Sequence, residues 1–153
     1  GGQGSTWLVD SVRTDSAATC GEAVIVIGAN RDRRRDCAAG GALERWSDRE
    51  QRWVDLRPIA PGTTRRYARP AGTVEYATDA AVVDTIGGVP VTVIPTTVTT
   101  FDSTGVARRR LRERYAVGLM TATWGSFEAP DGAGWRVERE FRLVAIEAPA
   151  GKP

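Results

Sequence analysis

The chain contains no histidine. This absence excludes Ser–His–Asp triads, histidine general bases, haem ligation through a proximal histidine, and every zinc site that uses imidazole. Only two cysteines are present, Cys20 and Cys37, and two thiolates alone cannot complete a structural zinc site. We therefore expect a protein that works without a metal and without a cofactor.

Long apolar runs are also missing, since no stretch approaches the roughly 18 residues that a membrane helix needs. We therefore expect no membrane span. The chain begins GGQGST, without methionine and without the charged-then-apolar pattern of a signal peptide. A processed protein whose leader has been removed starts in this way. We expect an extracytoplasmic protein, secreted or anchored at the surface, and keep a cytoplasmic location as the alternative.

The two cysteines fit that expectation. An even number of cysteines at moderate spacing favours a disulfide in an exported protein. Closing a loop between Cys20 and Cys37 would stabilise the fold by about 3 kcal/mol on the chain-entropy estimate. The alternative is a pair of buried thiols.

Net charge is only +2, so no global field directs the chain to nucleic acid or to a membrane. Lys152 is the only lysine, and the other positive side chains are arginines, which suit bidentate recognition of carboxylate or phosphate. Binding of single-stranded nucleic acid needs aromatic rings among the basic residues. Only Trp124 meets that condition, so nucleic acid is an improbable partner.

The 153 residues are enough for one domain with a real core. We expect a flexible lead-in over 1–4, a single β domain over 5–148 and a flexible tail over 149–153. Over Arg108–Phe127, alternate residues from Arg108 to Arg114 are arginines, and the residues between and after them from Leu111 to Leu119 are mostly apolar, which predicts a strand with one buried face. Alternation over Thr73–Val83, Val89–Phe101 and Trp135–Ile146 extends this into an antiparallel meander.

Further strands near 5–13, 22–28, 42–46 and 52–57 bring the count to about eight. We predict a mainly β fold, an antiparallel meander in a closed or nearly closed barrel. The segments Asn30–Asp36 and Gly62–Gly72 are predicted loops. The alternative is an α+β fold in which a helix near 42–56 lies on a curved antiparallel sheet. Pairing Phe101 with Ala107 would place Val93 opposite Tyr115, Val91 opposite Val117 and Val89 opposite Leu119.

Glu113 is a charged residue on the apolar side of its strand, between Leu111 and Tyr115. A carboxylate there would be desolvated unless it is paired, and Arg139 on the inward side of the last strand is the natural partner. With Arg139, Tyr115 and Tyr76 nearby, the Glu113 carboxylate could act as a general acid or base in a small cofactor-free isomerase or cyclase. The structural alternatives are an inert buried ion pair, or a position near the wet end of the strand.

Arginines on the outward side of the Arg108–Phe127 strand are the second candidate. They could bind an acidic partner or a polyanion, or they could be the wet face of a sheet. Met120 and Trp124 would join this surface if the strand is regular, whereas a bulge at Gly118 would bury Trp124. The candidate binding residues are Arg110, Arg112, Arg114, Met120, Trp124 and Arg142.

Three functions remain open. The first is a non-catalytic exported or surface-associated domain that binds a partner protein or a small apolar or anionic ligand. The second is the cofactor-free enzyme built on Glu113. The third is a structural subunit of a larger assembly, such as a virion or cell-envelope complex, with a homo-oligomer possible.

Overall fold

The computed structural model describes residues 5–14, 19–27 and 30–144, which form twelve antiparallel strands. The predicted mainly β, antiparallel fold is confirmed. Strand pairing forms two open ladders, one of five strands and one of seven, and no closed barrel occurs among these residues. Where the sequence predicts one β domain over 5–148, contacts divide the chain into two compact units, Gly1–Ala60 and Pro61–Pro153. Each unit is described by itself.

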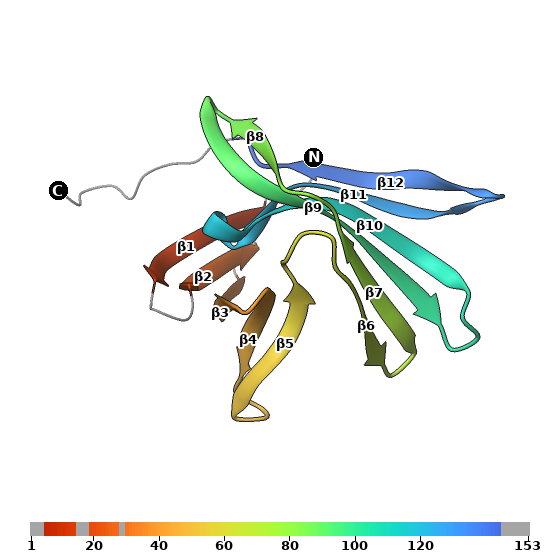
Figure 1. Ribbon diagram of the computed structural model, residues 1–153, viewed down its shortest axis with the longest axis horizontal. Helices are drawn as coiled ribbons and strands as arrows, with labels where there is room; N and C mark the ends of the chain where they lie inside the picture. The colour runs from red at the N-terminus through yellow and green to blue at the C-terminus, as the bar shows by residue number, and fades with distance from the viewer. Residues whose placement is uncertain (1–4, 15–18, 28–29, 145–153) are drawn as a thin grey trace. The chain divides into compact units, whose positions relative to one another are not determined.

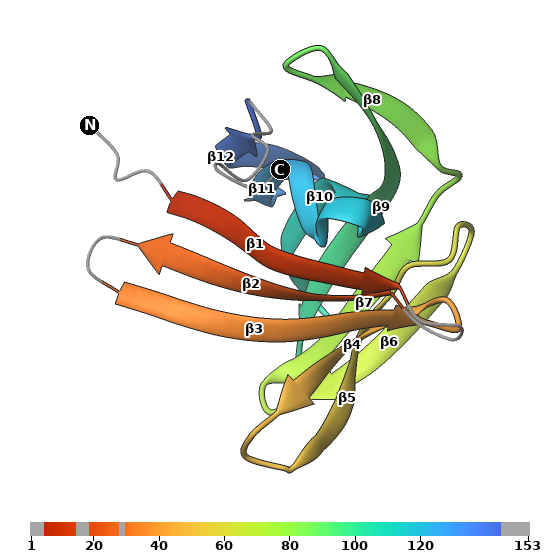
Figure 2. The same ribbon diagram turned by 90° about the vertical axis from the view of Figure 1, so that its left-hand side faces the viewer.

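The first unit is a meander in which each strand pairs with the next along the chain (Figure 2). Tight turns join the later strands, as at Gly40 and Gly41, which both have positive φ angles. The strands are β1 (Ser5–Thr14), β2 (Thr19–Ile27), β3 (Asn30–Ala39), β4 (Ala42–Ser47) and β5 (Arg52–Pro58).

The loop predicted over Asn30–Asp36 is wrong, because this segment belongs to β3. This segment mixes arginine with aspartate and has no alternating apolar residues, so its sequence predicts a solvated loop. The neighbouring strand decides the conformation: the apolar run Ala23–Ile27 of β2 pairs with 30–34 residue by residue. Tertiary pairing overrides local preference here.

The segment 42–56 is a hairpin, as predicted, and the alternative helix is wrong. Trp46 and Trp53 stand directly opposite each other, and their rings meet edge to face with centroids 5.7 Å apart. Cross-strand aromatic pairs stabilise antiparallel ladders. The two tryptophans therefore favour the hairpin over a helix.

Two covalent or ionic links fix the register of β2, β3 and β4. Cys20 stands opposite Cys37 with 4.0 Å between Cα atoms, and the predicted disulfide joins them. In the next pair of strands Arg45 donates two hydrogen bonds to the buried carboxylate of Asp36, from Nε at 2.7 Å and from Nη2 at 2.9 Å. Leu43, nearly fully buried, belongs to the core of this region.

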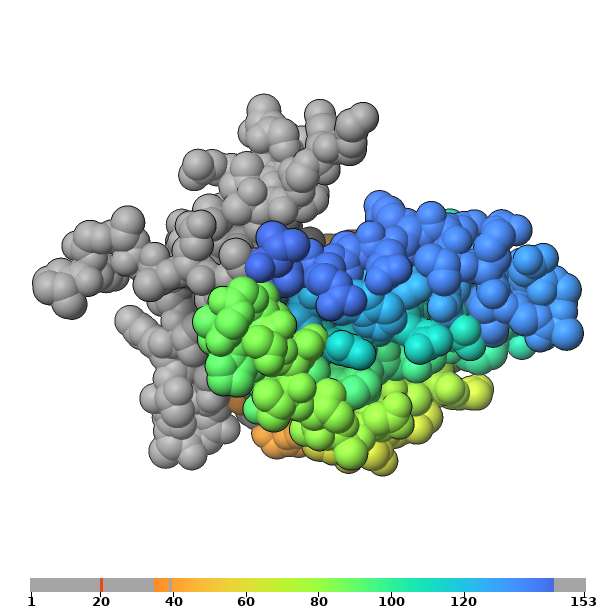
Figure 3. Space-filling model, turned by 90° about the horizontal axis from the view of Figure 1, so that it is seen from above, coloured from red at the N-terminus to blue at the C-terminus, as the bar shows by residue number. Residues whose placement is uncertain are grey.

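The second unit is a seven-stranded sheet in the order β12-β11-β10-β9-β7-β6, with β8 paired to the first part of β9 (Figure 1). The space-filling view follows the same order as a continuous surface from the blue β12 to the yellow-green β6 (Figure 3). The elements are β6 (Thr64–Arg69), β7 (Gly72–Thr78), β8 (Val82–Ile86), β9 (Val89–Asp102), β10 (Ala107–Ala116), the 3-10 turn η1 (Val117–Leu119), β11 (Thr121–Asp131) and β12 (Gly134–Arg142).

Several predictions for this unit are wrong. The strand predicted over Thr73–Val83 is interrupted at 79–81, so that β7 ends at Thr78 and β8 begins at Val82. The predicted loop Gly62–Gly72 contains β6, a solvent-exposed edge strand that has too few apolar residues to be recognised. The predicted continuous strand Arg108–Phe127 is the hairpin β10–β11, because the chain reverses through η1. Met120 closes this turn in the left-handed conformation, with φ 53° and ψ 35°.

The predicted register holds at its start and then slips by one residue. Phe101 pairs with Ala107, but a bulge follows between Ala107 and Arg109. Tyr115 consequently stands opposite Ile94 rather than Val93. The expected pairs Val91–Val117 and Val89–Leu119 do not form, because β8 pairs with that part of β9 and β10 has already ended.

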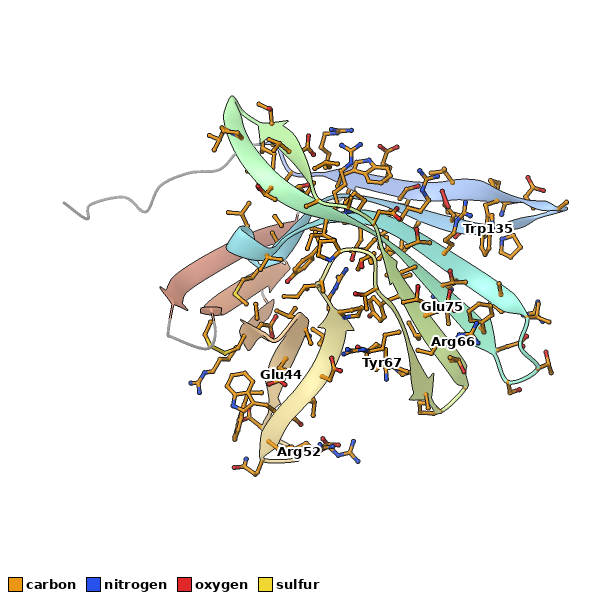
Figure 4. The ribbon with its side chains drawn as sticks, viewed as in Figure 1. Glu44, Arg52, Arg66, Tyr67, Glu75 and Trp135 are labelled. Atoms are coloured by element: carbon orange, nitrogen blue, oxygen red, sulfur yellow. A yellow bond between two sulfur atoms is a disulfide. The ribbon has the colours of Figure 1, made fainter. Side chains whose placement is uncertain are left out.

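The pairing registers assign side chains of the second unit to two faces, since directly opposed residues share a face. In Figure 4, Arg66 and Glu75 point toward each other from neighbouring strands, and Tyr67 points the other way. We name the "apolar face" by Tyr67, Tyr76, Val98, Leu111, Phe127 and Phe141. We name the "Arg/Trp face" by Arg110, Arg112, Arg114, Trp124, Trp135 and Arg142.

Candidate functional site

Arg110 occupies a fixed position on the Arg/Trp face. Its Nε lies 2.6 Å from Oε1 of Glu128, its direct neighbour on β11, and the Glu128 side chain is only 5% exposed. The guanidinium of Arg110 also lies over the ring of Trp135, 4.6 Å from the centroid. Cation–π contact and ion pairing together hold this arginine and this tryptophan in one arrangement.

Arg114 and Trp124 form a second fixed pair on the same face. The guanidinium lies over the Trp124 ring at 5.5 Å and reaches Oδ2 of Asp84 with Nη1 at 3.3 Å. The indole N–H of Trp124 donates to Oε1 of Glu140 at 2.7 Å. Two contacts thus hold the Trp124 side chain, one over its ring and one at its indole N–H, while the residue stays partly exposed.

Arg112 and Arg142 differ from these two. Both are exposed, and neither has an acidic partner within the described part of the chain. Arg112 stands between Thr97 of β9 and Ser126 of β11, and Arg142 stands beside Trp124. The Arg/Trp face therefore presents two available guanidinium groups among side chains that internal contacts hold in place.

Two residues expected on this surface lie elsewhere. Met120 is buried, with 4% of its surface exposed, because the turn after β10 changes its direction. Arg108 sits in the bulge at the start of β10, and its Nε donates to Oδ2 of Asp102 at 2.7 Å.

Asp102 organises the hairpin connection between β9 and β10. Its carboxylate accepts hydrogen bonds from the hydroxyl and amide of Thr104, at 2.6 and 2.9 Å, and from the amide of Val106 at 3.0 Å. The Thr104 hydroxyl first, then the Val106 amide and Arg108, hold the pKa of Asp102 well below its ordinary value. Gly105 supplies the left-handed residue of this turn, with φ 83°. This carboxylate has a structural role.

A shallow polar groove of about 360 Å³ lies beside this turn. Its two charged residues are already engaged, Arg66 with Glu75 at 2.7 Å and Asp102 with its own turn. The groove therefore offers no available charged group to a ligand. It is lined by Arg66, Gly72, Thr73, Phe101, Asp102, Ser103 and Gly105.

Glu113 is buried, with 7% exposure, as its position on the apolar side of β10 predicts. Its direct neighbours are Thr96 and Gly125, and the ring of Phe141 covers Gly125 on that face. The expected ion pair with Arg139 is wrong: no such pair occurs in the part of the chain that the structure describes. β11 separates the two strands, and the Arg139 guanidinium rests over the Phe127 ring at 4.4 Å.

Of the other two residues in the predicted catalytic cluster, Tyr115 lies near Glu113 and Tyr76 does not. Tyr115 follows two positions after Glu113 on the same side of β10 and is also buried. Tyr76 lies on β7, with β9 between it and β10, and its ring meets Tyr67 edge to face at 5.6 Å. The sheet therefore brings Glu113 and Tyr115 together and places Arg139 and Tyr76 on other strands.

Sequence reasoning missed the residues that fix the Arg/Trp face. Unbroken alternation over Trp135–Ile146 would place Trp135 on the same side as Phe141, but a bulge between Phe127 and Glu128 in the β11–β12 pairing moves it to the opposite side. Glu128 and Asp84 carried no recognisable signal, because their partners lie 18 and 30 residues away along the chain. Only the correct register reveals such pairs.

The chain matches no protein family, no curated protein and no solved structure. Over the described ranges, no helix has the length and hydrophobicity to cross a membrane. Within the same ranges, no three His, Cys, Asp or Glu side chains gather as metal ligands would.

Proposed function

We propose that the protein is a non-catalytic, extracytoplasmic binding module that holds an acidic protein partner on the Arg/Trp face. The disulfide between Cys20 and Cys37 is compatible with an oxidising compartment. The observation that carries the proposal is the combination of fixed Trp124 and Trp135 rings with the available guanidinium groups of Arg112 and Arg142.

This composition suits a protein interface. Tryptophan and arginine dominate the residues that contribute most to binding, and lysine does not. Because Trp124 is already tied to Arg114 and Glu140, little side-chain entropy is lost when a partner covers it. Arg112 and Arg142 then supply charge-assisted hydrogen bonds to carboxylates of the partner.

The experiment compares affinities for two synthetic decapeptides, one rich in glutamate and one rich in lysine, by calorimetry. We expect saturable binding of the acidic peptide alone. Arg112→Glu should weaken it about tenfold or more, which corresponds to about 1.4 kcal/mol. Arg49→Glu, the same charge reversal on the exposed β4–β5 turn, is the matched control and should bind as the wild type does.

Two results would reject the proposal. One is equal binding of the acidic and basic peptides. The other is an equal loss of affinity in Arg112→Glu and Arg49→Glu, because that pattern reports net charge alone. Higher ionic strength should weaken the specific binding, since exposed charges are screened within about 8 Å at physiological salt.

A further inference from the structure

The apolar face of the second unit carries a row of side chains that runs across four strands. Tyr76 of β7 stands opposite Val98 of β9, Val98 opposite Leu111 of β10, and Leu111 opposite Phe127 of β11. All four are partly exposed. The row is therefore continuous, apolar and only half removed from solvent.

Aromatic pairs extend this row at both ends. Tyr67 of β6 meets Tyr76 with ring centroids 5.6 Å apart, and Phe141 of β12 meets Phe127 at 5.9 Å. The resulting band reaches from β6 to β12, which are five strand spacings apart. At about 4.8 Å for each spacing, the band is roughly 24 Å long. An extended alkyl chain could lie along it.

Guanidinium groups cap the two ends of the band. Arg69 lies over the Tyr67 ring at 5.4 Å, and Arg139 lies over the Phe127 ring at 4.4 Å. Both are exposed, and within the described residues neither has an acidic partner. Arg109, exposed on β10 and on the same face as Leu111, likewise has none there.

On the opposite side of the sheet, only Arg112 and Arg142 of the arginines named for the Arg/Trp face lack an acidic partner among the described residues. There, most guanidinium groups are neutralised by a carboxylate on a neighbouring strand or turn. The pairs on that side are Arg66 with Glu75, Arg110 with Glu128, and Arg114 with Asp84. On the apolar face, Arg69, Arg109 and Arg139 thus place positive charge that no described carboxylate neutralises beside a continuous apolar row.

We propose that the apolar face binds a single-chain anionic amphiphile, a long-chain carboxylate. Its alkyl chain lies along the band, and its carboxylate takes hydrogen bonds from Arg69 or Arg139. Charge complementarity selects an anion, because a guanidinium accepts a carboxylate in a bidentate geometry. The exposed apolar row selects a long chain, because each buried methylene adds to the affinity. This surface is separate from the Arg/Trp face, and the two proposals stand independently.

The test titrates the full chain with dodecanoate below its micelle-forming concentration and follows binding by calorimetry. We expect saturation at one dodecanoate per chain. Decanoate and octanoate should bind more weakly by about threefold to fourfold for each methylene removed. Dodecyltrimethylammonium has the same chain and the opposite charge, and it should bind at least about tenfold more weakly than dodecanoate.

Variants locate the site. Arg69→Gln/Arg139→Gln should weaken dodecanoate binding about tenfold or more. Both side chains are exposed, and we expect the fold to be kept, with circular dichroism as the check. Arg49→Gln/Arg52→Gln removes two exposed arginines from the β4–β5 hairpin and should leave the affinity unchanged.

Four results would overturn the proposal. They are equal affinity for the cationic amphiphile, affinity that does not depend on chain length, wild-type affinity in Arg69→Gln/Arg139→Gln, and binding to phosphatidylglycerol vesicles without binding to free dodecanoate. The last result would identify a lipid surface instead. None of these results bears on the acidic-peptide experiment, so the two proposals can fail separately.

Discussion

The ring of Phe141 occupies the place where a Cβ on Gly125 would lie. Phe141 stands directly opposite Gly125 in the β11–β12 pairing, and β12 is the last strand of the ladder. An aromatic ring laid over a glycine on a neighbouring strand compensates for the missing side chain. The same ring packs against Phe127, so Phe141 contacts both Gly125, the neighbour of the buried Glu113, and Phe127 on the apolar face.

Gly125→Ala should therefore displace the Phe141 ring. The ring is 37% exposed and can swing outward, so we expect a loss of about 1 kcal/mol in the free energy of unfolding, close to the value of one aromatic pair. Urea denaturation measures it. In a Phe141→Ala background the same substitution should cost nothing, because the obstacle is gone. An equal cost in both backgrounds would contradict this arrangement.

Arg45→Met should destabilise the first unit strongly. It would leave the buried carboxylate of Asp36 without its two guanidinium hydrogen bonds, and we expect a loss on the order of 2–3 kcal/mol. Arg52→Met is the matched control, because the Arg52–Glu50 pair is exposed and should contribute less than about 1 kcal/mol. Chemical denaturation of both variants measures the two losses in the free energy of unfolding. Equal effects would show that burial of Asp36 has no energetic consequence.

Asp102 should make stability depend on pH in the acid range. Its pKa is lower in the folded protein than in the unfolded chain, so its contribution is fully present above the ordinary value of about 3.9. That contribution is lost as the pH falls below this value. The difference in melting temperature between the wild type and Asp102→Asn should shrink from pH 6 toward pH 2.5. A difference that stays constant over that range would contradict the hydrogen-bond network of this turn.

Reduction of the disulfide should lower the free energy of unfolding by about 3 kcal/mol, since Cys20 and Cys37 close one loop of the unfolded chain. The Cys20→Ser/Cys37→Ser variant should show the same loss without reductant. Hydrogen exchange would show whether protection falls in β2 and β3 alone or in β9 and β10 as well. Loss throughout the chain would support the expected single domain over 5–148, and a loss confined to the first unit would contradict it.

The sequence allowed the mainly β fold, the β4–β5 hairpin and the disulfide to be predicted, because each depends on local alternation or on a residue type. It did not allow the bulge at Arg108 or the turn through Met120 to be predicted. The bulge and the turn both change which residues on neighbouring strands face each other. Nothing in the alternating pattern of the sequence marks either of them. The predicted Glu113–Arg139 pair was wrong because of the missed turn. Parity placed both residues on the correct side of the sheet, but it did not reveal that β11 lies between their strands.

The membership of the Arg/Trp face was predictable in part. Arg110, Arg112 and Arg114 share a face because β10 is regular after its bulge, and Trp124 and Arg142 join them through direct pairing. Trp135 required the irregular register of β12. Which guanidinium groups are available could not be predicted, since that depends on carboxylates of other strands such as Glu128 and Asp84.

The central claim is that the Arg/Trp face is the surface that meets an acidic partner. The most direct measurement follows the arginine Nε–Hε signals of the isotope-labelled protein by NMR during titration with the glutamate-rich decapeptide. We predict saturable shifts at Arg112 and Arg142, with no shift at Arg49 on the β4–β5 turn. Equal shifts at all three arginines, or no saturable shift at Arg112 and Arg142, would contradict the account.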